Sequence, residues 1–213
     1  MNSIRKIALV GNPNSGKTSL FNRLTGLNQR VGNYPGVTVD KRSGTIKLPN
    51  GEICELIDLP GTYSLSSKSD DEKVVQDILL NPKSKSFPDL VVFVADGTNL
   101  ARNLFFASQV IDLGIPTILV INMIDITEKD GDIIDLEKVS AYFGVATLGI
   151  SARKGTNVEE LLALAESYDE KPSGSKFNST NYNSLLNEAS EILEVKSDYM
   201  LFKLICQNDE LVS

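Results

Sequence analysis

Short apolar runs alternate with amphipathic stretches along most of this chain. Apolar runs of this length are typical of strands covered on both faces, whereas apolar residues three and four positions apart mark one face of a helix. The expected strands are 7–10, 90–94, 117–121 and 145–150, and the expected helices follow residue 17 and occupy 70–80, 100–111, 136–143 and 158–165. This alternation predicts an α/β fold with a doubly wound, mostly parallel sheet, whose ligand sites lie at the carboxyl ends of the strands.

One part of the pattern departs from this alternation. Segments 37–48 and 52–57 are predicted as two strands, and the Asn50-Gly51 turn between them is the strongest short-range signal for an antiparallel hairpin. The polar, glycine-containing segment 26–36 that precedes them is expected to be a functional loop.

A linker separates the alternating region from the end of the chain. Lys171-Pro172-Ser173-Gly174-Ser175 has linker composition, and apolar stripes at helical spacing beyond it predict helices over 182–193 and around 199–205. We therefore expect a first domain over 1–167 and part of an all-α helical domain over 168–213. Two helices bury little core alone, so they must dock on the sheet domain, on further chain or on a partner.

Composition narrows the function classes. The 213 residues carry a net charge of −7 without a basic stripe, which argues against a nucleic-acid partner. The absence of histidine excludes Ser-His-Asp hydrolysis and zinc sites of the histidine type. No apolar run approaches the ~18 residues that span a bilayer, so the chain as given is expected to be soluble. The distant Cys54 and Cys206 suit a reducing compartment.

The most specific motif is Gly11-Asn12-Pro13-Asn14-Ser15-Gly16-Lys17-Thr18, a complete phosphate-binding loop set between a predicted strand and a predicted helix. The two glycines let the backbone N–H groups turn toward an anion, and the following helix directs its positive end to the same point. Lys17 supplies charge to the terminal phosphates, and the Thr18 hydroxyl is a ligand for Mg²⁺. Ser19 completes the expected binding segment.

Two further segments address the γ-phosphate and the metal. Asp58-Leu59-Pro60-Gly61 follows an apolar strand, so Asp58 can reach Mg²⁺ and the Gly61 N–H can meet a γ-phosphate. Thr38, after Gly36 and Val37, is the expected threonine that binds Mg²⁺ and senses the γ-phosphate. Thr25 and Thr45 are its rivals, but one ends the first helix and the other lies in mid-strand.

Two segments that follow other predicted strands are expected to select the guanine base. In Asn122-Met123-Ile124-Asp125, the carboxylate of Asp125 can accept from both the ring N–H and the exocyclic amine of guanine, which adenine does not present. In Ser151-Ala152-Arg153, a backbone N–H can address the guanine carbonyl oxygen. Together with the phosphate loop, these segments indicate a protein that binds GTP and GDP.

These elements resemble the Ras-like GTPase superfamily, and longer stretches resemble one family within it. This family is FeoB, the bacterial ferrous iron transporters. The chain resembles the cytosolic N-terminal region of FeoB most specifically at residues 12–22, 31–39, 58–65, 96–103 and 113–116, and the resemblance as a whole extends over about 4–166. The resemblance implies a six-stranded Ras-type sheet with one antiparallel strand, a following helical domain, and a GTPase tied to Fe(II) uptake through a C-terminal membrane region. The implied partners are this membrane region and, as a possibility, further copies of the same chain in a homo-oligomer. The implied location is the cytoplasmic face of the bacterial inner membrane.

The resemblance also bears on the mechanism. It implies that Asn14 helps to coordinate K⁺ in the position of an arginine finger. Thr62 stands where Ras carries the glutamine that orients water, so catalysis is expected to depend on Asn14, Thr38 and Gly61. Two alternatives stay open: a soluble GTPase acting on the ribosome or transfer RNA, and a slowly hydrolysing nucleotide sensor that works through partner binding.

Overall fold

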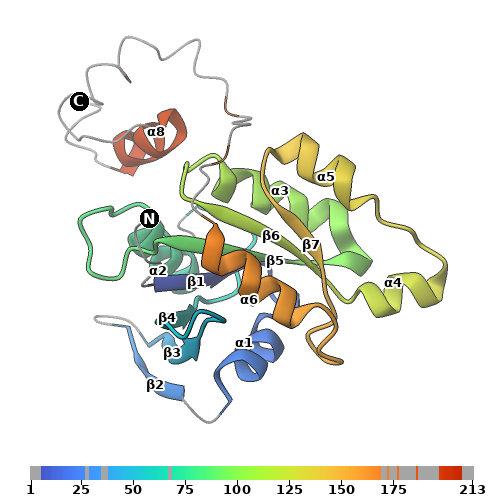
Figure 1. Cartoon of the computed structure of the whole chain (residues 1–213). Helices are drawn as coiled ribbons and strands as arrows, with labels where there is room; N and C mark the ends of the chain where they lie inside the picture. Colours follow the sequence, from blue (N-terminus) through green and yellow to red (C-terminus); the bar gives the residue numbers. More distant parts are fainter. Residues whose placement is uncertain are drawn as a thin grey trace.

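The protein is described from a computed structural model that covers residues 6–26, 29–34, 38–66, 69–168, 172, 177, 186 and 197–207, with the side chains of the last segment described as far as Lys203. Seven strands form one sheet in the order β2-β3-β4-β1-β5-β6-β7 (Figure 1). Only β3 runs against the others, because β3 pairs antiparallel with both neighbours while the remaining pairs are parallel. The strands are β1 (Lys6–Val10), β2 (Gln29–Asn33), β3 (Asp40–Lys47), β4 (Ile53–Asp58), β5 (Leu90–Asp96), β6 (Thr117–Asn122) and β7 (Thr147–Gly149).

Helices cover both faces of this sheet. They are α1 (Lys17–Thr25), α2 (Asp70–Leu79), α3 (Leu100–Ile111), α4 (Ile124–Asp130), α5 (Leu136–Phe143), α6 (Val158–Ser167) and α8 (Asp198–Gln207), with a short 3-10 turn, η1 (Gly97–Asn99), before α3. Side chains along β1 alternate between two cores: Ile7 and Leu9 pack with α1 and α6, whereas Ala8 and Val10 pack with α2 and α3. The central strands are therefore apolar on both faces, as the sequence pattern predicts.

The segment 26–36, expected to be a loop, contains an additional strand. β2 pairs along its whole length with β3, from Gln29 opposite Gly44 to Asn33 opposite Asp40, so the sheet has seven strands rather than six. Every residue of β2 is exposed, so this edge strand carries no apolar alternation by which the sequence could have revealed it. Its stability comes from backbone pairing with β3 rather than from burial.

The C-terminal helix packs on the same face as α2 and α3. α8 confirms the helix expected around Tyr199 and Phe202, and its Met200 joins the core beneath it. Ser197, just before α8, donates its hydroxyl to the carbonyl oxygen of Asp112 at 2.6 Å. The helix predicted over 182–193 lies outside the described residues except for Leu186, which is helical. Among the described helices, none has both the length and the apolar composition to cross a membrane.

Candidate functional site

The phosphate-binding motif forms the loop between β1 and α1. Gly16 has a φ of 88°, and a Cβ there would lie 2.1 Å from Nδ2 of Asn122. A side chain at this position would clash with the Asn122 side chain, and its backbone would be strained at this positive φ. Glycine is therefore required. The loop ends directly at Lys17, the first residue of α1, so the N-terminal N–H groups of the helix face the same space as the loop.

Lys17 is buried within this loop. Its ammonium group donates to the carbonyl oxygens of Gly11 at 3.1 Å and Asn12 at 3.2 Å. Loss of hydration lowers the pKa of Lys17, and the nearby carboxylate of Asp58 opposes that shift. A phosphate group bound in the loop would neutralise the poorly hydrated positive charge of Lys17. The electrostatics of the loop therefore favour the binding of an anion.

Asp58, at the end of β4, and Thr18 form the candidate metal site. Oδ2 of Asp58 accepts a hydrogen bond of 3.5 Å from the Thr18 hydroxyl, and among the described residues the buried Oδ1 has no hydrogen-bond partner. Burial raises the pKa of Asp58, while Lys17, Arg42 and Thr18 act to lower it. A divalent cation would favour the ionised form of Asp58, and carboxylate and hydroxyl oxygens are ligands that Mg²⁺ prefers. The residues present therefore fit a magnesium ion.

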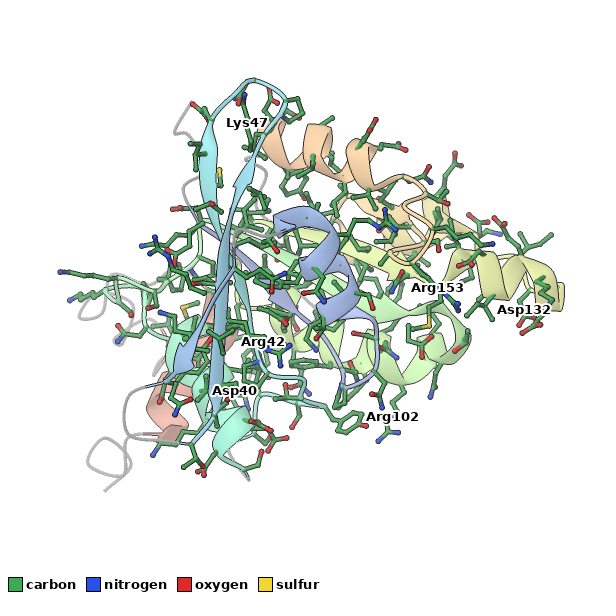
Figure 2. All side chains as sticks on the ribbon, turned by 90° about the horizontal axis from the view of Figure 1, so that it is seen from below. Asp40, Arg42, Lys47, Arg102, Asp132 and Arg153 are labelled. Atoms are coloured by element: carbon green, nitrogen blue, oxygen red, sulfur yellow. The ribbon has the colours of Figure 1, made fainter. Side chains whose placement is uncertain are left out.

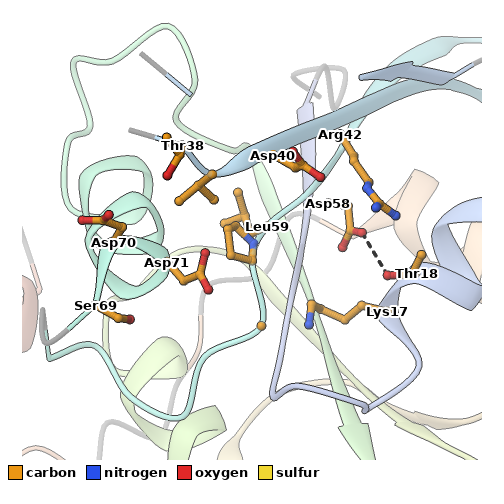
Figure 3. A pocket seen from close by; sticks show the side chains of 13 residues that line it. Lys17, Thr18, Thr38, Asp40, Arg42, Asp58, Leu59, Ser69, Asp70 and Asp71 are labelled. Atoms are coloured by element: carbon orange, nitrogen blue, oxygen red, sulfur yellow. Dashed lines mark hydrogen bonds between the residues drawn. The ribbon is translucent and has the colours of Figure 1, made fainter. Parts of the chain in front are cut away.

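A cavity of about 590 Å³ brings the metal and γ-phosphate candidates together (Figure 3). Lys17, Thr18, Thr38, Asp58 and Gly61 all line it, as do Leu59 and Pro60. The rivals of Thr38 do not line it: Thr25 is buried and donates its hydroxyl to the Phe21 carbonyl oxygen at 2.7 Å, and Thr45 lies within β3. The geometry therefore favours Thr38 among the three threonines.

Three carboxylates that sequence reasoning did not place in the site also line this cavity: Asp40, the first residue of β3, and the pair Asp70 and Asp71. Asp70 and Asp71 form the first turn of α2, which begins after Ser69. The Ser69 hydroxyl accepts from the Glu72 N–H at 3.2 Å, so the Ser-x-x-Glu spacing is the sequence signal that fixes where this turn starts.

Gly61 packs directly against the phosphate loop. A Cβ at this position would lie 2.9 Å from Cα of Pro13 and 3.1 Å from Nζ of Lys17. The next N–H, of Thr62, donates to the Gly11 carbonyl oxygen at 3.3 Å. The Thr62 hydroxyl is buried and has no hydrogen-bond partner among the described residues. Close contact between the two loops places the backbone of Gly61 beside the ammonium group that would hold the terminal phosphates.

Asn122 connects three of the predicted segments. Its Nδ2 donates to the Ser15 carbonyl oxygen at 2.9 Å, and its Oδ1 accepts from the Ala152 N–H at 2.9 Å. The phosphate loop, the end of β6 and the loop after β7 are thus held at fixed separations. Sequence reasoning assigned Asn122 to the guanine motif but did not reveal this connecting role, because both of its partners are backbone atoms.

Asp125, the residue expected to read guanine, lies in the first turn of α4 and follows Met123, which has a φ of 65°. Its Oδ2 lies 3.0 Å from Nζ of Lys154, and its side chain is 20% exposed. Hydrogen bonds from Ser151 and Lys154 lower the pKa of Asp125, so the carboxylate stays ionised near neutral pH. Lys154 is a residue of this site that the sequence analysis missed.

Asn14, Ser19 and Arg153 are the remaining predicted residues that the structure describes. Asn14 is exposed and has a φ of 63°, and Ser19 is exposed on α1. Arg153 lies on the loop after β7, on the side of the molecule where Asp132 follows α4 (Figure 2). Gly36 and Val37 lie outside the described residues.

Comparison with known proteins identifies the family. Residues 5–165 match the family described as ferrous iron transport protein B. The chain belongs to the FeoB family. The Fe(2+) transporter FeoB of Leptospira biflexa is 44% identical over 167 residues, which are 77% of this chain and 24% of that protein. FeoB of Escherichia coli K12 is 39% identical over 190 residues, which are 89% of this chain and 24% of that protein. The chain thus spans about a quarter of the length of these FeoB relatives.

Solved structures of FeoB cytosolic regions share the fold. An S. thermophilus NFeoB mutant bound to GDP aligns with a TM-score of 0.82 at 37% identity, covering 98% of this chain and 81% of that one. The cytosolic domain of T. maritima FeoB in its GMPPNP form aligns with a TM-score of 0.82 at 34% identity, covering 98% of this chain and 84% of that one. These FeoB matches confirm the Ras-like α/β fold class and the family resemblance seen in the sequence.

Proposed function

We propose that this chain binds GTP and GDP with Mg²⁺ and hydrolyses GTP to GDP and phosphate, as the cytosolic part of a ferrous iron uptake transporter. The observation that carries the proposal is the double contact of Asn122 with Ser15 and Ala152, because it holds a phosphate site and a guanine site at one fixed separation. The GDP and GMPPNP forms of related FeoB regions support the same nucleotide class.

In this proposal each residue at the phosphate end has a defined task. The loop amides and Lys17 hold the β- and γ-phosphates, and the Gly61 N–H addresses the γ-phosphate. Thr18, Thr38 and Asp58 would hold Mg²⁺, which when bound neutralises charge on the phosphate oxygens. Asp125 and the loop that contains Ser151, Ala152 and Arg153 select guanine over adenine.

Nucleotide titration tests the binding proposal directly. We expect GDP and GTP to bind in the presence of Mg²⁺ at least ~100-fold more tightly than ADP and ATP, because adenine leaves the Asp125 carboxylate without its two donors. Equal affinity for adenine and guanine nucleotides, measured by calorimetry at pH 7, would contradict the assignment.

Asn14 is proposed to hold K⁺ beside the phosphates. An amide oxygen is a suitable ligand for this ion, and the Asn14 side chain is exposed on the phosphate loop. An added positive charge of the arginine-finger kind is worth roughly 10³–10⁵ in rate, and Thr62 leaves the chain without the glutamine that orients water in Ras.

We expect Asn14→Ala to abolish the stimulation of GTP cleavage by K⁺, with a fall of at least ~100-fold in the single-turnover rate in K⁺. The rate in Na⁺ should change little, since the proposal assigns the stimulation to K⁺ alone. Asn81→Ala, which removes an exposed asparagine just after α2, is the matched control and should keep the full K⁺ response. Retention of that response by Asn14→Ala would overturn the proposed potassium site.

A slowly hydrolysing nucleotide sensor is the second candidate, and Thr62 is the observation that favours it. The Thr62 side chain is buried, and its N–H is engaged with the Gly11 carbonyl oxygen. The same single-turnover assay separates the two functions, because a sensor would show no K⁺-dependent cleavage while still binding GTP.

In a full-length FeoB protein, we expect this chain to be connected to a membrane region. The 168–213 segment is proposed as part of a helical domain that leads from the GTP-binding domain, 1–167, toward a membrane region, and α8 docked on the α2–α3 face supports a mechanical connection. The proposed location is the cytoplasmic face of the bacterial inner membrane. A homo-oligomer is a candidate partner, and nucleic acid is not.

A further inference from the structure

Arg23, in the last turn of α1, is bound to the loop that follows β7. Its Nε donates to the Ala152 carbonyl oxygen at 2.5 Å, and its Nη2 donates to the Arg153 carbonyl oxygen at 2.5 Å. One guanidinium group therefore holds two successive carbonyl groups, a geometry that its planar fork of donors allows and that a lysine cannot reproduce.

The same loop also bends around the guanidinium group. Gly155 has a φ of 88°, and a Cβ there would lie 2.7 Å from Nη1 of Arg23. The Gly155 N–H donates to the Ser151 carbonyl oxygen at 2.7 Å, which closes the turn from 151 to 155. A side chain at position 155 would displace the guanidinium group, so the glycine and the arginine fit each other.

This loop carries the groups expected to read the base. Ala152 donates its N–H to Asn122, and Lys154 pairs with the Asp125 carboxylate at 3.0 Å. Asn122 thus fixes the loop from the β6 side, and Arg23 fixes it from the α1 side. The loop can move away from a bound base only when the contacts on one of these sides are broken.

We infer that Arg23 is a positioning residue for guanine, which holds the loop at 151–155 closed on the base and thereby sets the rate of GDP release. The inference rests on the proposed binding of guanine nucleotides. In this inference Arg23 does not contact the nucleotide. By binding the carbonyl groups of Ala152 and Arg153, it holds the loop so that a loop N–H can donate to the guanine carbonyl oxygen.

The test compares GDP with 2-aminopurine riboside 5′-diphosphate, which keeps the exocyclic amine but lacks the 6-carbonyl oxygen and, with it, the ring N–H. In Arg23→Gln we expect GDP to dissociate about tenfold faster, because hydrogen bonds from a charged donor are lost. The analogue should dissociate at nearly its wild-type rate, since it never used the loop N–H. Arg23→Lys, which keeps the positive charge but not the planar fork of donors, should give an intermediate GDP rate.

Lys83→Gln is the charge-matched control, because it removes one positive charge from an exposed loop after α2. It should release GDP at the wild-type rate. Melting curves without nucleotide show whether Arg23→Gln is folded, and a loss of binding that is equal for both nucleotides would mean a general structural defect and would overturn the inference. An unchanged GDP rate in Arg23→Gln overturns the inference alone, whereas wild-type protein that binds no GDP overturns the proposed function with it.

Discussion

Asp125→Asn is expected to change a guanine site into a xanthine site. In the proposed site the carboxylate accepts from two donors on guanine, whereas an asparagine amide offers one acceptor and one donor. Xanthine keeps the ring N–H and replaces the exocyclic amine with a carbonyl oxygen, so it matches the amide. We expect GDP affinity to fall by roughly 100-fold or more, and xanthosine diphosphate to become the preferred ligand.

Competition titrations with GDP, xanthosine diphosphate and ADP measure this change. The pKa of Asp125 lies below its ordinary value of 3.8, since Ser151 and Lys154 stabilise the charged form, so the wild-type carboxylate stays ionised from pH 5 to pH 8. The GDP preference of the wild type should therefore be flat over that range and decline only in stronger acid. Asp132→Asn removes an equal charge from an exposed position beyond α4 and should leave the preference unchanged. Undiminished GDP affinity in Asp125→Asn would show that another group reads the base.

Lys17→Met is expected to remove binding of every nucleotide, whatever its base. The methionine keeps most of the buried apolar stem of Lys17, whereas the ammonium group that now donates to the Gly11 and Asn12 carbonyl oxygens is lost. We expect the affinities for GDP and GTP to fall by roughly 10³-fold, because the charged hydrogen bonds to two phosphates disappear together.

Thermal unfolding separates this loss from a loss of folding. Burial is the main influence on the Lys17 pKa, so replacing the ammonium group with an apolar one should not lower the melting temperature of the free protein. The rise in melting temperature that GDP gives the wild type should vanish in the variant. Lys83→Met, at an exposed position, should keep that rise in full. A GDP-induced rise in Lys17→Met would show that the loop amides alone hold the phosphates.

The central fold was predictable because its signals are local. β1, β5 and β6 are continuous apolar runs, and a strand buried on both faces needs no other pattern. β2 and α4 were not predicted, for different reasons. β2 is exposed along its whole length and depends on its pairing with β3, and α4 has only seven residues, too few to show a helical period.

The class of chemistry could be predicted from the sequence, whereas the contacts that hold the site together are visible only in the folded protein. A phosphate loop, an Asp-x-x-Gly segment and Asp125 are recognisable because short-range spacing alone gives them their geometry. The contacts of Asn122 with Ser15, of Lys154 with Asp125 and of Arg23 with Ala152 join segments 107, 29 and 129 residues apart. Two of these three contacts end on backbone carbonyl oxygens, which every residue carries, so no side-chain pattern marks them. They exist only because parallel strands bring their carboxyl ends to one edge of the sheet.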